Sequence, residues 1–396
     1  MAEPRFSGDL SDTERFWRDH ASWLEEKGYH LRPRYQPEWM PSWASKPDER
    51  FAFEDAYKAK ETLHLMDALR ISDGLMVMIK KVEVNDLENP TREIRMSRLL
   101  CSGLFSLDDS QNHCVPMYEI LQLPEDNRTH LLVMPFLEPW WPKLLSEVSF
   151  STIGEAIAFM RQIFEGVRLL HSHNIAHNDI KHDNVMVDAS PLYKHLMHPS
   201  VPGRRYDWRG FATRKSLTRN PVKYYMIDFG SALQYDPQNG PAREAPGYGG
   251  DRALPEFENH PNDPCDPYAV EVFRLGNLVR RFLMTNQHVW KPEEVKDLKV
   301  NHAMDFMSDL VAEMTQEDPS KRPSMDQVMK RFDEIVKGLS FFKLRSRFWP
   351  GFKNESFLAR TLWIIPRHFV SQVINVLGRY PAIPPTPGPP KGKKRK

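Results

Sequence analysis

The chain has 396 residues, of which 40% are hydrophobic and 27% are charged, a balance that predicts a globular core and excludes a disordered or collagen-like chain. Lys and Arg total 54 against 53 Asp and Glu, but residues 337–396 hold 13 of the basic residues and one acid, Glu355, so an acidic body carries a strongly basic tail. Three cysteines without close spacing exclude a disulfide framework and a Cys-based zinc site. Without a secretory signal or a long apolar run, the pattern predicts a protein inside the cell.

Apolar periodicity places the expected elements in chain order. Residues 10–27 predict a short helix that ends at Gly28, and the Pro- and Trp-rich residues 29–50 predict an extended segment wrapped on a domain. Strands are expected at 74–82 and 129–134, with a helix at 91–100 between them. Farther along we expect helices at 152–171, 266–284, 303–315 and 324–337, and one strand at 223–227. A small mixed unit therefore precedes a larger helical unit.

Two short motifs carry the chemistry. Residues 177–184 read HNDIKHDN, and residues 228–230 read DFG. Transfer of a phosphoryl group from ATP depends mostly on positioning and charge neutralisation. It needs a carboxylate facing the acceptor hydroxyl, a cation at the transferring oxygens and oxygen ligands for magnesium. Asp179 fits the carboxylate and Lys181 the cation, while Asn184 and Asp228 fit the metal ligands.

These motifs resemble the H-R-D-x-K-x-x-N loop and the D-F-G motif of the eukaryotic protein kinase superfamily in order and spacing. The resemblance covers about residues 63–337. It implies an α+β, bilobal fold with a small β-rich lobe at 51–137 and a large helical lobe at 138–337, between an N-terminal extension at 1–50 and a basic tail at 338–396. It also implies ATP and Mg²⁺ as cofactors and a protein substrate. The opening FWRDHASWLEEKGYHLRPRY and an insertion before YYMIDFG resemble kinase-like proteins of mushroom-forming fungi.

Further landmarks of the family's nucleotide site appear ahead of these motifs. Residues 77–80 (VMIK) are similar to the family's V-A-I-K strand, which makes Lys80 the expected ligand of the α- and β-phosphates. Glu93 resembles the helix glutamate that pairs with that lysine. Residues 133–136 (VMPF) resemble the hinge, with Met134 behind the adenine and Phe136 offering backbone groups.

Structural landmarks follow in the family's order. The resemblance implies that His177 packs beneath Phe229 of the D-F-G motif, which Gly230 completes. Residues 254–256 (LPE) stand where the family has A-P-E, and residues 271–276 (EVFRLG) resemble a buried helix that usually opens with aspartate. Arg322, in the run DPSKRP, is expected to pair with Glu256.

The sequence also departs from the family. The stretch expected to hold a glycine-rich phosphate cover, residues 57–74, has one glycine, Gly74. Asn178 replaces the arginine that receives a phosphate on the activation segment, and residues 228–256 contain no threonine and one serine, Ser231. We therefore expect any activity to be independent of phosphorylation there.

Three functions are compatible with this pattern. A lysine two residues after Asp179 favours a serine/threonine protein kinase. The absent glycine cover favours a pseudokinase scaffold with weak or no nucleotide binding. A small-molecule kinase is a third alternative, which the A-P-E-like run and Arg322 disfavour.

Two basic regions lie outside the motifs. The insertion at 188–224 holds eight Lys and Arg and two acids, and either docks an acidic or phosphorylated partner or is a solvated loop. Residues 341–377 either pack on the large lobe or lie on an anionic membrane or in a partner groove. The final run KGKKRK, from Lys391 to Lys396, could act as a nuclear address, so the expected location is cytoplasmic, nuclear or both. Nucleic-acid binding is not expected, because no reader motif accompanies the charge.

Overall fold

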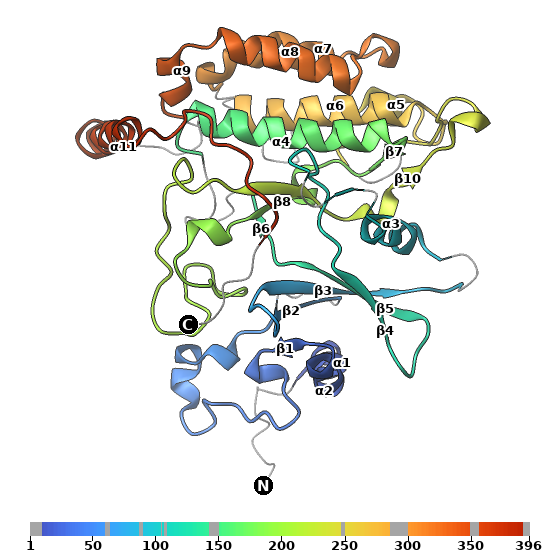
Figure 1. Cartoon of the computed structure of the whole chain (residues 1–396), viewed down its shortest axis with the longest axis vertical. Helices are drawn as coiled ribbons and strands as arrows, with labels where there is room; N and C mark the ends of the chain where they lie inside the picture. The colour runs from blue at the N-terminus through green and yellow to red at the C-terminus, as the bar shows by residue number, and fades with distance from the viewer. Residues whose placement is uncertain are drawn as a thin grey trace.

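The computed structural model describes residues 10–59, 64–86, 90–103, 105–106, 109–141, 150–246, 250–285, 300–348 and 356–390. Two parts are visible in Figure 1, a sheet with short helices at one end and stacked helices at the other. They are the small and the large lobe expected from the sequence.

The small lobe is built on a five-stranded antiparallel sheet with the order β1-β2-β3-β5-β4. Its strands are β1 (Tyr29–Leu31), β2 (Leu65–Arg70), β3 (Met76–Glu83), β4 (Glu119–Gln122) and β5 (Thr129–Pro135). Helix α3 (Arg92–Cys101) follows β3, so the expected strands at 74–82 and 129–134 and the helix at 91–100 are present. In the register of the sheet, Lys80 lies opposite Leu65 on one side and Leu132 on the other.

The amino-terminal segment belongs to this lobe. The single helix expected at 10–27 is two helices, α1 (Asp12–Asp19) and α2 (Ala21–Glu26), which meet at His20, and Ser11 caps the first. Residues 29–56 form β1 and the short 3-10 helices η1 (Pro33–Tyr35), η2 (Pro47–Ala52) and η3 (Glu54–Ala56). Trp17 and Leu24 pack in one core with residues of β2, β3 and β5. The sheet and its core therefore run across the expected boundary between residues 50 and 51.

The large lobe contains most of the helices. These are α4 (Ile153–Ser172), α5 (Pro255–Asn259), α6 (Pro267–Val279), η10 (His302–Met307), α7 (Ser308–Met314) and α8 (Met325–Gly338). The helix expected at 266–284 changes to a π-helical turn, η8 (Arg280–Met284), at its end, and the one expected at 303–315 begins as the 3-10 helix η10. The short strands are β6 (Glu138–Pro139), β7 (Ile175–Ala176), β8 (Val185–Asp188), β9 (Lys223–Met226) and β10 (Leu233–Gln234).

The insertion between β8 and β9 reaches from the large lobe to the small lobe. Trp208 Nε1 donates a hydrogen bond to the carbonyl oxygen of Ala52 over 2.6 Å, and its ring lies 5.2 Å from that of Tyr57. His198 Nδ1 accepts hydrogen bonds from the backbone N–H groups of residues 200 and 201, so its Nε2 carries the proton and donates it to Glu54 over 3.0 Å. The insertion thus connects the lobes through residues that follow β1.

The basic tail returns to the large lobe. It forms α9 (Phe341–Arg345), α10 (Phe357–Ala359), a π-helical turn η12 (Arg360–Ile364) and α11 (Ile365–Leu377). Beyond α11 the chain passes the start of α4 so closely that a Cβ atom on Gly154 would lie 2.0 Å from the carbonyl oxygen of Ala382. Only glycine fits at that crossing. Across the ranges given above, the structure has no helix of the length and apolar character needed to cross a bilayer.

Candidate active site

Three charged side chains meet where the lobes face each other. Lys80 on β3 places its Nζ 2.6 Å from Oε1 of Glu93 on α3 and 3.2 Å from Oδ1 of Asp228, which follows β9. Burial alone would lower the pKa of Lys80, but the two carboxylates outweigh burial and raise it, so the ammonium is retained. Burial alone would raise the pKa of Asp228, but Lys80 lowers it, so this carboxylate stays ionised. The cluster can present a fixed cation and a carboxylate to a nucleotide.

The loop at residues 177–184, which carries the first motif, lies beside this cluster. Lys181 Nζ contacts Oδ2 of Asp179 at 2.7 Å, and Asn184 Nδ2 donates to the same oxygen, also at 2.7 Å, and to the Asp179 carbonyl oxygen at 2.8 Å. The other carboxylate oxygen of Asp179, Oδ1, is buried and has no hydrogen-bond partner within the described part of the chain. Because buried acceptors are rarely left unpaired, this oxygen is a candidate to accept a substrate hydroxyl.

Backbone contacts join the two motifs. The Ile227 N–H donates to the Asn184 carbonyl oxygen over 2.9 Å, which continues the β8–β9 pairing to the residue before Asp228. His177 Nε2 donates to the Ile227 carbonyl oxygen over 3.0 Å, and its ring lies 4.8 Å from the ring of Phe229, as expected. Asp228 itself has a φ of 64°, in the left-handed region, which turns its side chain toward Lys80. A Cβ on Gly230 would lie 3.4 Å from Asp228 Oδ1, so Gly230 borders the charged cluster.

The donor set fits magnesium bound together with phosphates. Since Asn184 directs its Nδ2 at Asp179, its Oδ1 remains available, and Asp228 uses only Oδ1 for Lys80. Within the described ranges, no three or more His, Cys, Asp or Glu side chains cluster in a way that could hold a metal alone. Mg²⁺ commonly takes one or two protein oxygens and completes its shell with phosphate and water. Asn184 and Asp228 could hold it in that way.

The adenine edge differs from the expectation at one atom. Met134 lies on β5 opposite Met78 of β3. The Phe136 N–H donates to the Met76 carbonyl oxygen over 3.0 Å, so one of the backbone groups expected to serve the nucleotide is used within the sheet. Register explains the difference, because Phe136 extends the β3–β5 pairing by one more bond.

The segment in place of a glycine-rich cover is also longer than expected. Because β1 is Tyr29–Leu31 and β2 begins at Leu65, residues 32–64 connect the first two strands, whereas the sequence predicts the cover at 57–74. Residues 32–64 contain no glycine. Instead, the connection buries Arg32 and Arg34 in ion pairs with acids of the small lobe.

Asn178 anchors the activation segment without a phosphate. It has a φ of 62°, and its Nδ2 donates to the Ser231 carbonyl oxygen at 3.2 Å and to the Tyr235 hydroxyl at 3.4 Å. Its backbone N–H donates to Glu271 over 2.6 Å. Glu271 opens the EVFRLG run, so the glutamate there holds the loop at residues 177–184.

Ion pairs at Glu244 and Glu256 also hold that segment. Arg92 on α3 contacts Glu244 at 3.0 Å. Arg322 forms a bidentate pair with Glu256, at 2.6 and 2.8 Å, as expected. The same guanidinium donates to three backbone carbonyl oxygens and lies 4.8 Å from the ring of Phe273, so the LPE run is fixed to the helical core.

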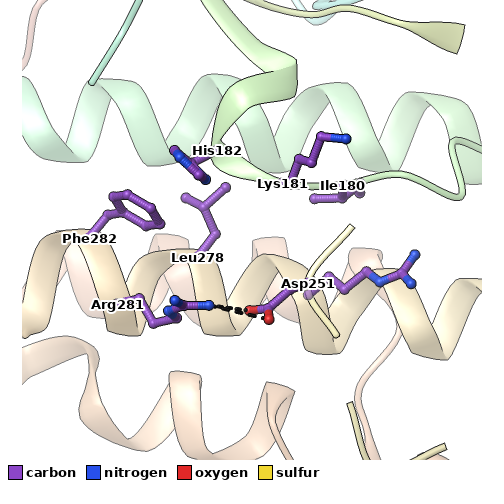
Figure 2. Close-up of a pocket in the computed structure, with 8 residues that line it drawn as sticks. Ile180, Lys181, His182, Asp251, Leu278, Arg281 and Phe282 are labelled. Carbon is purple, nitrogen blue, oxygen red and sulfur yellow. Dashed lines mark hydrogen bonds and ion pairs between the residues drawn. The ribbon is translucent and has the colours of Figure 1, made fainter. Parts of the chain in front are cut away.

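A pocket lies next to the loop at residues 177–184. Figure 2 shows Lys181 and His182 on one side of it, and Asp251 paired with Arg281 at 3.2 Å on the other. Asp251 also accepts a hydrogen bond from Asn277. Asp251 and Arg281 were not predictable from the sequence, because no motif marks them and their contact depends on the turn that begins η8.

The sheet, the helical lobe and the Lys80–Glu93–Asp228 cluster between them are the arrangement of a protein kinase. Residues 65–332 match the family model described as Protein kinase domain. Since this match covers more than half of the chain, the protein belongs to the protein kinase family. The match begins at β2, so β1 and its helices lie outside it.

Curated relatives share parts of this region at low identity. The chain is 27% identical to serine/threonine-protein kinase oca2 of Schizosaccharomyces pombe over 125 residues, which are 32% of this chain and 18% of that protein. It is 24% identical to rat myosin light chain kinase 3 over 159 residues, 38% of this chain and 19% of the relative. It is 30% identical to calcium-dependent protein kinase 5 of Plasmodium berghei over 159 residues, 38% of this chain and 24% of the relative. The aligned segments thus span less than a quarter of each relative.

Proposed function

We propose that this protein is a serine/threonine-type protein kinase that transfers the γ-phosphate of Mg-ATP to a protein hydroxyl. The observation that carries the proposal is the Lys80–Glu93–Asp228 cluster beside a loop in which Asp179 keeps one buried carboxylate oxygen without a partner among the described residues. The position of Lys181, two residues after Asp179, supports the serine/threonine type.

Each side chain has one task in this reaction. The acceptor hydroxyl oxygen bonds to the γ-phosphorus, the bond from that phosphorus to the β–γ bridging oxygen breaks, and ADP leaves. Asp179 accepts a hydrogen bond from the hydroxyl and takes up its proton. Lys181 neutralises charge on the transferred group, and Lys80 orients the α- and β-phosphates. Magnesium held by Asn184 and Asp228 supplies further positive charge to the phosphates when bound.

A thermal-shift titration with ATP tests nucleotide binding. We expect ATP with magnesium to raise the melting temperature of the wild type and not of Asp228→Asn, because the substitution removes a metal ligand. Asp326→Asn, an exposed substitution on α8, should respond like the wild type. Transfer of labelled γ-phosphate to a protein substrate should then be lost in Asp179→Asn while the ATP shift persists.

A pseudokinase scaffold is the second candidate, and the glycine-free connection at 32–64 favours it. Absence of a magnesium-dependent shift in the wild type would select this candidate. An ATP shift in both the wild type and Asp228→Asn would contradict the metal role proposed here.

Two further hypotheses concern partners and location. An acidic or phosphorylated partner at 188–224 is one, although His198 of this insertion already contacts an acid of the same chain, Glu54. Nuclear import through KGKKRK is the other, and this run lies outside the described residues. A fluorescent fusion with and without the final six residues tests it.

A further inference from the structure

The long helical segment of the tail, residues 357–377, turns its polar side toward the protein. His368 Nε2 donates to the Arg345 carbonyl oxygen at 3.1 Å, and Arg345 Nη1 donates to Gln372 at 3.3 Å. Asn375, buried on the same side, donates to Gln372 at 3.4 Å, and Arg345 also donates to the Tyr380 carbonyl oxygen. Spacings of three and four residues place His368, Gln372 and Asn375 on one helix face.

The apolar side of this segment faces outward. Leu362, Trp363 and Phe369 are 71%, 68% and 67% exposed. Other exposed apolar residues of the segment are Leu358, Ile365, Val370, Val373, Ile374, Val376 and Leu377. A surface helix of a globular protein ordinarily buries its apolar stripe and exposes its polar one. Here the arrangement is reversed, and Figure 1 shows α11 at the outer edge of the helical lobe.

Positive charge surrounds this face. Arg360 and Arg367, both exposed, are two helical turns apart, and exposed Arg379 follows the end of α11. Residues 356–390 contain no Asp or Glu. The tail from residue 337 onward has a net charge of +12, whereas residues 1–336 have a net charge of −11. An anionic surface would therefore attract the tail and repel the body, which orients the molecule.

We propose that the outward face of residues 357–377 binds the surface of an anionic lipid membrane. The helix lies in the plane of the interface, with Leu362, Trp363 and Phe369 among the lipid chains and Arg360 and Arg367 at the phosphates. Its polar side is held by Arg345 and faces protein, so only one side of the helix meets lipid. A second copy of this chain fits less well, since its equivalent face would bring the same arginines into apposition.

Vesicle sedimentation with the full chain tests the proposal. We expect the protein to sediment with vesicles of equal parts phosphatidylcholine and phosphatidylserine, and not with vesicles of phosphatidylcholine alone. Trp363→Glu combined with Phe369→Glu should weaken binding at least about tenfold, because two aromatic side chains no longer enter the interface. Arg360→Glu combined with Arg367→Glu should do the same through charge.

Control variants distinguish binding through this surface from nonspecific adsorption to vesicles. Met40→Glu combined with Ile71→Glu changes two exposed apolar residues of the small lobe and should leave binding as in the wild type. All these positions are exposed, so an unchanged melting temperature verifies the fold of each variant. Equal binding to both vesicle types would overturn the role of charge. Failure to bind either type would overturn the proposal, and a dimer that Trp363→Glu dissociates would assign the face to a second copy instead.

Discussion

The side chain of Arg32 connects the amino-terminal segment to the rest of the small lobe. It is 1% exposed and forms a double contact with Asp67 on β2, at 2.8 and 3.2 Å. It also donates to Glu54 at 3.0 Å, to the Tyr57 carbonyl oxygen at 2.8 Å and to Ser200 of the insertion at 3.2 Å. One guanidinium therefore connects β1, the chain that follows it, β2 and the insertion.

Replacing Arg32 by methionine keeps much of the apolar stem and removes the charge. Asp67, 4% exposed at its side chain, would then be a buried carboxylate without its cation. Removing one member of a buried ion pair typically costs about 3–5 kcal/mol. We expect Arg32→Met to lower the free energy of unfolding by about that amount, measured by urea denaturation followed by circular dichroism.

The matched control is Arg15→Met on α1. Arg15 pairs with Asp12 at 3.0 Å, but the two side chains are 50% and 98% exposed, so its loss should cost less than about 1 kcal/mol. A combined Arg32→Met and Asp67→Leu variant should recover part of the loss, because no unpaired carboxylate remains at that position. If Arg32→Met unfolds within about 1 kcal/mol of Arg15→Met, the integration of residues 10–59 into the lobe is refuted.

Glu54, Arg322 and Asn178 each make contacts whose loss can be measured. Burial would raise the pKa of Glu54, but the hydrogen bond from His198 and the charge of Arg32 outweigh burial and lower this pKa below 4.5. The Glu54 carboxylate therefore stabilises the fold above that pH, and this stabilisation is lost as the pH falls through the lowered pKa. The stability advantage of the wild type over Glu54→Gln should therefore shrink between about pH 6 and about pH 3 in urea titrations, and a constant difference would contradict this assignment. Arg322→Leu should lower the free energy of unfolding by about 3–5 kcal/mol, because it breaks the buried pair with Glu256. Lys321→Leu, at an exposed neighbour, should change the free energy of unfolding by less than about 1 kcal/mol. Equal effects of the two substitutions would show that the pair with Glu256 is not the cause. Phosphatase treatment should leave kcat unchanged. Asn178→Gly should lower kcat, because it keeps the positive φ and removes both side-chain hydrogen bonds of Asn178. Loss of activity on dephosphorylation would refute the phosphate-independent arrangement.

Residues within motifs were predictable because a motif specifies both chemistry and position. Asp179 and Asn184 are five residues apart on one loop, and the pairing of β8 with β9 brings Asp228 to that loop. The partners Glu93 for Lys80 and Glu256 for Arg322 came from the resemblance, and the structure contains both contacts.

Features that depend on tertiary contacts were not predictable in the same way. Strand β1 has three residues in a segment rich in Pro and Trp, and nothing local indicates that it pairs with β2. The use of the Phe136 N–H depends on the register of β3 against β5. Periodicity predicts that α11 has two faces, but it cannot tell which face the protein covers. In this tail the carbonyl and guanidinium of Arg345 settle that question, by binding the polar face.

Helix α3 contacts both Lys80 and the segment that follows Asp228. Adjacent residues of its first turn have different partners, since Arg92 contacts Glu244 and Glu93 contacts Lys80. The first turn of α3 therefore connects the segment that carries Glu244 with Lys80. In the protein kinase family, the order of this segment depends on a phosphate that an arginine receives. Here Asn178 stands at the position of that arginine and binds the start of the segment directly. Because neutral hydrogen bonds and a carboxylate hold Asn178 in place, we expect the order of this segment not to depend on phosphorylation.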